Sequence, residues 1–140
     1  MIPENQLVDR IKQYPGRNFG LEGLIDKVDI VGTSSGESNL IFFVDINSLP
    51  YLIKINGVGG KEVSFFRAEY EKLKSMERYH IAPKAFVYDD TSFALPFMIL
   101  QRYEGRTLSP DECEERVSEI IPILNRLAEV PLNQIIKAKG

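Results

Sequence analysis

Residues 39–55 read NLIFFVDINSLPYLIKI, and this stretch decides the fold class. Its two ends, NLIFFVDI and YLIKI, are rich in β-branched and aromatic residues, and the NSLP between them is typical of a turn. The segment before it, LIDKVDIVG at residues 24–32, alternates loosely and ends in a glycine, as a further strand would. The simplest prediction is an antiparallel meander of three strands.

A long helix and two more strands are predicted after this meander. Residues 62–79 place apolar side chains at intervals of three and four, as a helix with one buried face does: Val63, Phe66, Tyr70, Leu73 and Met76. APKAFVYDD and LPFMILQRY predict two strands around the turn DDTS. The predicted class is therefore α+β, with a five-stranded antiparallel sheet, one long helix packed on it, then a hinge and a following helix.

The two ends of the chain also show helix patterns. Residues 6–13 predict a short amphipathic helix that stops at YPGR. Residues 109–130 predict a second long helix, because Ser109 can cap its start and Pro110 suits its first turn. Pro122 is expected to bend that helix.

Composition narrows the setting and the classes of partner. The 140 residues, 44% of them hydrophobic, suit one compact domain, and a single cysteine, Cys113, excludes a disulfide within the chain. With one histidine, His80, there is no Cys/His cluster for zinc. A net charge of −3 without a basic cluster gives no support for nucleic-acid or membrane binding. With no signal peptide or apolar span in the sequence, we expect a cytoplasmic protein.

Two charged residues occur where the pattern is otherwise apolar. Alternation in YLIKI places Lys54 on the face of Leu52 and opposite Ile53. Glu69 lies one helical turn from Phe65 and from Leu73, near the apolar stripe, so a partner is expected for it.

Other readings of these residues stay open. Lys54 can also be a lysine that guards an edge strand against aggregation, and Glu69 a solvated helix acid. Residues 32–39, GTSSGESN, can form a plain connecting loop, because Ser, Gly and Asn favour turns.

Four segments together resemble the aminoglycoside phosphotransferase and choline kinase-like enzymes, whose fold is that of protein kinases. VGTSSGESNLIFFVD resembles the hairpin that covers the phosphates, and PYLIKI resembles the strand that bears the phosphate-binding lysine. FRAEYEKLKSMERYHIAPKAF is similar to the family's long helix and next strand, and FALPFMILQRYEGRTL to its hinge. The resemblance covers nearly the whole chain. It implies an ATP-binding N-lobe at residues 1–104, and a hinge exit with the first helix of a C-lobe at residues 105–140.

The resemblance also implies a role for individual residues. Lys54 would contact the α- and β-phosphates of ATP, and Glu69 would hold the lysine in place. The main chain of Gln101 and Tyr103 would meet the adenine edge, with Leu100 behind it. Residues of the loop would lie over the phosphates: Ser34, Ser35, Gly36, Ser38 and Asn39. The apolar walls around the adenine would be Ile30, Val31 and Ile53.

The sequence lacks the family's catalytic loop, a histidine two residues before an aspartate base and then an asparagine, and its later metal-binding aspartate. The implied function is the ATP-binding lobe of a phosphotransferase that phosphorylates a small-molecule hydroxyl group, incomplete for catalysis in this chain. Mg²⁺ and the small-molecule substrate are expected only with a C-lobe. The alternative is a non-catalytic nucleotide- or protein-binding module, so whether the chain is an enzyme stays open. A lobe without its C-lobe would expose an apolar patch through which it can self-associate.

Overall fold

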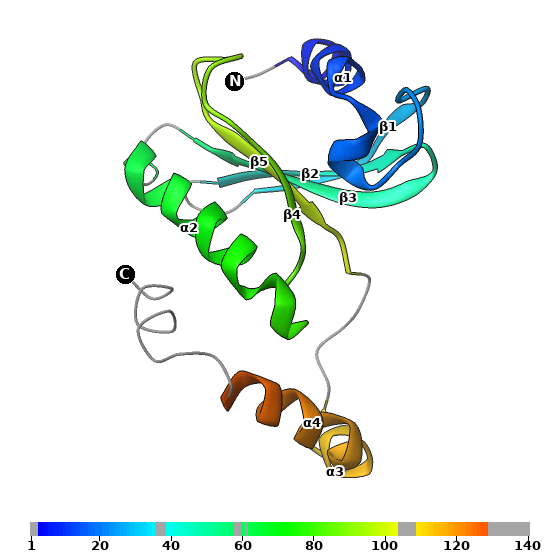
Figure 1. The fold of residues 1–140 in the computed structure, drawn as a ribbon, viewed down its shortest axis with the longest axis vertical. Helices are drawn as coiled ribbons and strands as arrows, with labels where there is room; N and C mark the ends of the chain where they lie inside the picture. The colour runs from blue at the N-terminus through cyan, green and yellow to red at the C-terminus, as the bar shows by residue number, and fades with distance from the viewer. Residues whose placement is uncertain (1–2, 36–38, 58–59, 61, 104–108, 129–140) are drawn as a thin grey trace.

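A computed structural model describes residues 3–35, 39–57, 60, 62–103 and 109–128 of the 140-residue chain. Its centre is an antiparallel sheet of five strands, in the spatial order β1-β2-β3-β5-β4 (Figure 1). The strands are β1 (Val28–Ser35), β2 (Asn39–Ile46), β3 (Leu49–Asn56), β4 (Ala85–Asp89) and β5 (Phe97–Gln101). The helices are α1 (Glu4–Gln13), α2 (Val63–Met76), α3 (Pro110–Glu115) and α4 (Val117–Ala128), and two short 3-10 turns are η1 (Gly16–Phe19) and η2 (Glu77–Tyr79).

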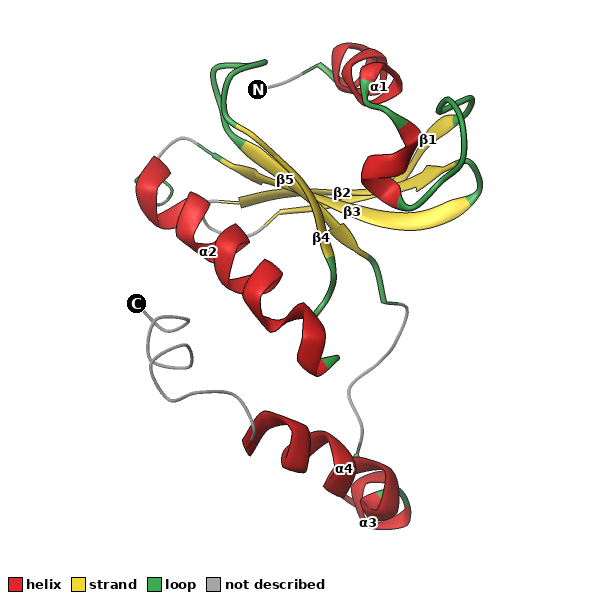
Figure 2. Cartoon of the chain, in the orientation of Figure 1, coloured by secondary structure: helices red, strands yellow, loops and turns green. Residues whose placement is uncertain are grey.

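The two long sides of the sheet carry different helices (Figure 2). One side, called here the α1 face, packs against Leu7 and Ile11 of the amphipathic helix α1. It holds the larger core, to which the alternate residues of the central strands contribute: Phe42, Val44, Ile46, Tyr51, Ile53, Ile55, Phe97 and Ile99. The opposite side, the α2 face, holds a smaller core around Phe66, Met98 and Leu100. The α2 face is the side on which the remaining residues of β2 and β3 lie.

The predicted fold class and the three-stranded meander are confirmed. β1 pairs with β2 and β2 with β3, both antiparallel, and β2 spans the residues predicted for it. β1 begins later than predicted and runs on to Ser35, so the first four residues of GTSSGESN belong to β1 and its last, Asn39, begins β2. β3 is an inner strand, which excludes the reading of Lys54 as an edge-strand lysine.

The long helix is confirmed, but one member of its predicted stripe is not buried. Phe66 is fully buried, and Tyr70 and Leu73 pack beside it. Val63 is 47% exposed, because it lies in the first turn of α2, beyond the edge of the smaller core. The stripe therefore begins one turn later than the sequence pattern indicates.

The C-terminal helix is divided, and not where expected. Ser109 caps the start of α3, as the sequence indicates, and it forms a capping box with Glu112 that was not predicted. The division falls at Arg116, while Pro122 lies inside α4. A proline ring clashes with the carbonyl four residues before it, here that of Ser118, which lies inside α4 and two residues after Arg116, so Pro122 does not account for the division.

Candidate nucleotide-binding site

The charged pair predicted from the sequence is present on the α2 face. The Nζ atom of Lys54, on β3, donates to Oε1 of Glu69, on α2, at 2.6 Å. The two side chains retain 20% and 28% exposure, so the pair lies at the edge of the smaller core and within reach of solvent. Because β3 is an inner strand and Glu69 of α2 pairs with the ammonium, the lysine is held at a fixed place on the α2 face.

Part of the predicted phosphate loop lies on the same face as this pair. Ser34 of β1 pairs with Ile41 of β2, and Ile41 pairs with Lys54, so the three residues form one row across the sheet. Asn39 begins β2 two residues before Ile41, which places it on the same face. Ser35 ends β1, where its backbone pairs with Leu40. Gly36 and Ser38 lie outside the described residues.

The apolar walls proposed from the sequence are wrong in two places. Ile53 is fully buried in the larger core, and Ile30 packs against that same core, so both belong to the α1 face. Val31 occupies an irregularity in the β1–β2 pairing and is 55% exposed.

A different set of side chains forms the apolar floor beside Lys54. Leu52 pairs with Phe43 on one side and with Leu100 on the other. Phe43 also lies across Gly32, where an added Cβ atom would come within 3.2 Å of its ring. The floor therefore consists of Ile41, Phe43, Leu52 and Leu100, which cross β2, β3 and β5. Leu100 is the one member that the sequence indicated.

The two predicted hinge residues lie at the end of β5. The backbone N–H of Gln101 donates to the carbonyl of Lys84 at 2.8 Å, and its side-chain Oε1 accepts from the Lys84 N–H at 3.3 Å. The N–H of Gln101 is thus engaged within the protein, in its pairing with Lys84. Tyr103 follows the strand and is 65% exposed.

Arg102, between these hinge residues, is a site feature that the sequence analysis missed. Its guanidinium donates to Oδ1 of Asp45 at 2.9 Å and to the carbonyl of Val44 at 3.4 Å, with its side chain 11% exposed. The side chain therefore crosses β3 and fixes the start of the hinge to β2. An aspartate in a β-rich run, followed far along the chain by a hinge arginine, was the only available signal.

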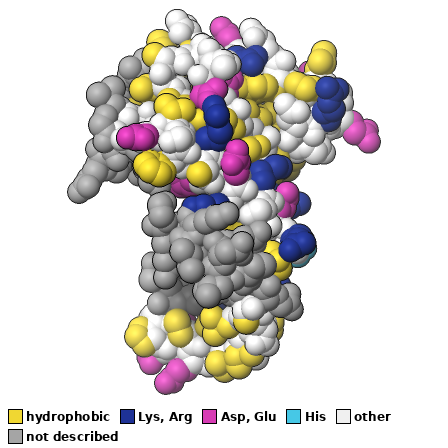
Figure 3. All heavy atoms as spheres, turned by 60° about the vertical axis from the view of Figure 1, so that its left-hand side comes forward, with side chains coloured by type: hydrophobic (Ala, Val, Ile, Leu, Met, Phe, Trp, Pro, Cys, Tyr) yellow, Lys and Arg dark blue, Asp and Glu magenta, His cyan; other side chains and the backbone are white. Residues whose placement is uncertain are grey.

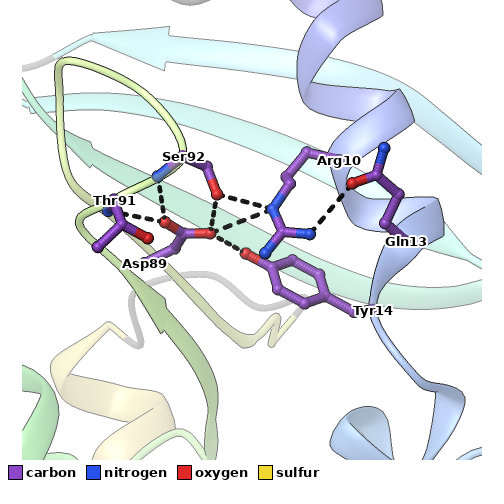
Figure 4. Close-up of polar contacts among 6 residues, drawn as sticks. All are labelled: Arg10, Gln13, Tyr14, Asp89, Thr91 and Ser92. Atoms are coloured by element: carbon purple, nitrogen blue, oxygen red, sulfur yellow. Dashed lines mark hydrogen bonds and ion pairs between the residues drawn. The ribbon is translucent and has the colours of Figure 1, made fainter.

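A second polar cluster lies outside this face and joins α1 to the turn after β4 (Figure 4). The Asp89 side chain, 5% exposed, accepts from the Tyr14 hydroxyl, the Ser92 hydroxyl and the backbone N–H groups of Thr91 and Ser92. Arg10 lies 3.4 Å from the carboxylate and 2.7 Å from the Ser92 hydroxyl. Burial alone would raise the pKa of Asp89, but these hydrogen bonds outweigh it and hold that pKa below its usual value.

Within the described ranges, no group of three or more His, Cys, Asp or Glu side chains is arranged to hold a metal ion. In that same part of the chain, every helix is too short or too polar to span a membrane.

The structure is similar to solved kinase-like enzymes. A thermostable mutant of aminoglycoside phosphotransferase APH(4)-Ia, without ligand, matches with a TM-score of 0.58 and 18% identity, over 94% of this chain and 40% of that one. The ternary complex of this phosphotransferase with AMP-PNP and hygromycin B matches with a TM-score of 0.55 and 18% identity, over 80% and 37%. An ethanolamine kinase from Plasmodium vivax matches with a TM-score of 0.54 and 19% identity, over 89% and 34%.

The fold is that of the kinase-like phosphotransferases. At these identities the likeness concerns the fold, and the chain spans 34–40% of the length of the three structures. No protein-family model matches the sequence, and a comparison with curated proteins finds no match.

Proposed function

We propose that this chain is the ATP-binding lobe of a kinase-like phosphotransferase that phosphorylates a hydroxyl group of a small molecule. The observation that carries the proposal is the partly exposed ion pair of Lys54 with Glu69 on the α2 face of a kinase-like sheet. A lysine ammonium is a compact charge that suits a polyphosphate, and a carboxylate partner keeps it in one orientation. The structure of a neighbour with the ATP analogue AMP-PNP supports the choice of nucleotide.

The residues of this face fit ATP in their chemistry. In the proposal, the Lys54 ammonium binds the phosphates and Ser34 and Asn39 offer further polar groups beside them. The apolar floor made by Phe43 and Leu52 suits the flat face of a base. ATP, a nucleoside triphosphate, supplies a transferable phosphoryl group when bound. The residues of this chain would bind and orient the nucleotide. The acceptor substrate and Mg²⁺ belong, in this proposal, to a C-lobe.

The proposed setting of the protein is the cytoplasm, where ATP is present and the exposed thiol of Cys113 stays reduced.

Titration of the chain with ATP, with and without Mg²⁺, tests the proposal. We expect Lys54→Ala to weaken ATP binding by about tenfold or more, because a hydrogen bond between charged groups contributes roughly 1.5–3 kcal/mol. Lys27→Ala is the control, because Lys27 precedes β1 at the end of the sheet away from Lys54, and its side chain is 67% exposed and pairs only with an exposed aspartate in the contacts described. Equal affinities of the wild type and Lys54→Ala would remove Lys54 from the phosphate site. Absence of ATP binding in the wild type would favour the protein-binding alternative.

We further propose that the chain associates with a second copy of itself through α4. The stripe Val117, Ile121 and Leu124 recurs at intervals of four and three on one side of that helix, and all three side chains are at least half exposed. Figure 3 shows hydrophobic side chains gathered at the end of the molecule where α3 and α4 lie. Apolar groups at helical spacing lose water when they pack against a like surface, which favours association.

A further inference from the structure

The position of Glu69 depends on how α2 is rotated about its own axis. Residues of an α-helix are separated by about 100° around the axis. Around the axis, the buried Phe66 and the partly buried Tyr70 and Leu73 form one stripe, which faces the sheet. Glu69 lies on one flank of the stripe and reaches β3, while Arg67 and Lys74 lie together on the opposite flank. A rotation of α2 would therefore carry Glu69 toward or away from Lys54.

The flank opposite Glu69 is fixed to both ends of β4. Near the start of α2, Arg67 donates to the Asp90 carboxylate just after β4, and its guanidinium lies 5.6 Å from the centre of the Tyr88 ring. About two turns later, Lys74 Nζ donates to the carbonyl of Ala85, at the other end of β4, at 2.9 Å. Two attachments that lie apart along one flank resist rotation of a helix better than an apolar stripe, whose contacts are not directional.

The anchor of Arg67 is itself held firmly. Asp90 adjoins Asp89, whose carboxylate is fixed by the turn residues Thr91 and Ser92 and by Tyr14, which directly follows α1 (Figure 4). Consecutive carboxylates thus hold one helix on each face of the sheet, since Asp89 binds α1 and Asp90 binds α2.

From these contacts we infer that Arg67, with Lys74, is a positioning residue for the candidate nucleotide site, because it sets the rotation of α2 that aims Glu69 at Lys54. The inference deepens the proposed function and rests on it for any effect on ATP binding. Its geometric part, that Arg67 acts on Lys54 through Glu69, can be measured without nucleotide.

The test compares the reactivity of individual lysines toward an amine-acylating reagent, read by mass spectrometry of peptides. In the wild type, the ion pair should protect Lys54 relative to the exposed Lys27. We expect Arg67→Met, which keeps the aliphatic stem, to raise the Lys54 to Lys27 ratio several-fold, and Asp90→Asn to do the same. Arg67→Lys, which keeps the charge, should restore part of the protection.

A double variant separates positioning from general loosening. Glu69→Gln should raise the reactivity ratio, and adding Arg67→Met to Glu69→Gln should change it no further, because Arg67 acts through Glu69. A ratio in Arg67→Met equal to that of the wild type, or an additive effect in the double variant, overturns the inference.

ATP titration of the same proteins distinguishes the two proposals. If the ratio changes as expected while the wild type binds no ATP, the proposed function fails and the positioning role stands. If ATP binding depends on Lys54 and is unaffected by Arg67→Met, the positioning role fails and the proposed function stands.

Discussion

Asp89 is the residue with the densest set of polar contacts described in the structure, and it bridges α1 and the turn after β4. Replacing it with alanine leaves the buried Tyr14 hydroxyl and two backbone N–H groups without their acceptor. We expect Asp89→Ala to lower the free energy of unfolding by roughly 2–4 kcal/mol. Urea unfolding measures this. Asp9→Asn, an exposed acid on the same helix α1, is the control and should be nearly neutral; an equal loss in both variants would show that the network contributes little.

The same residue predicts how stability depends on pH. The pKa of Asp89 is lower in the folded protein than in the unfolded chain, because hydrogen bonds outweigh its burial. The unfolded chain therefore binds more protons between the two pKa values, so this contribution is complete above about pH 4 and is lost as the pH falls toward the folded value. Urea unfolding should show a shallower decline below that pH for Asp89→Asn than for the wild type. Parallel curves would contradict the assignment.

At the residue scale, the sequence predicted the charged pair of the candidate site better than the apolar side chains around it. Lys54 and Glu69 could be predicted because each interrupts an apolar pattern and so requires a partner. Ile53 was assigned to the wrong face, although the alternation that placed Lys54 already put its neighbour on the opposite side. Phe43 and Leu52 could have been found by the same rule. Arg102 could not, since its contact with Asp45 depends on which strands are adjacent.

At the scale of elements, local signals predicted where helices and strands begin more reliably than where they break. The cap at Ser109 was predicted from the sequence because it needs only neighbours along the chain. The division at Arg116 was not, because no glycine or proline marks that position in the sequence. The extension of β1 to Ser35 was missed for another reason: its residues favour turns, and pairing with β2 overrides that preference.

The cap of α3 gives a prediction for a single element. The Ser109 hydroxyl accepts from the Glu112 N–H, and the Glu112 carboxylate accepts from the Ser109 N–H. Ser109→Ala should destabilise the start of α3 by about 1 kcal/mol. Hydrogen exchange at the amides of Glu112 and Cys113 should quicken several-fold, while amides in β3 stay unchanged. Ser109→Asp, which also caps, is the control and should leave exchange near the wild-type rate; no change in the alanine variant would mean that the cap does not limit local opening.

At the scale of the whole molecule, the order of the strands required more than local pattern. The sequence shows β4 and β5 after a helix but does not say that β5, rather than β4, lies next to β3. That order depends on long-range pairing, in which Met98 lies opposite Lys54 and Leu100 opposite Leu52. Because β5 lies between β3 and β4, the helix α2, which contacts β4, also reaches β3 through Glu69. The candidate site depends on this strand order, since Lys54 is on β3 and Glu69 on α2.

The exposed stripe of α4 gives the prediction for the whole molecule. If Val117, Ile121 and Leu124 pack against a second copy, the average mass should rise with protein concentration, because burial of apolar side chains offsets the loss of free motion. Ile121→Glu should abolish the rise, since a charge cannot be buried there without a partner. Leu24→Glu is the control, because Leu24 is 77% exposed but lies away from α4, and it should associate as the wild type does. Light scattering over a concentration series decides: a constant monomer mass for the wild type rules out association, and equal behaviour of the two glutamate variants places any association elsewhere on the surface.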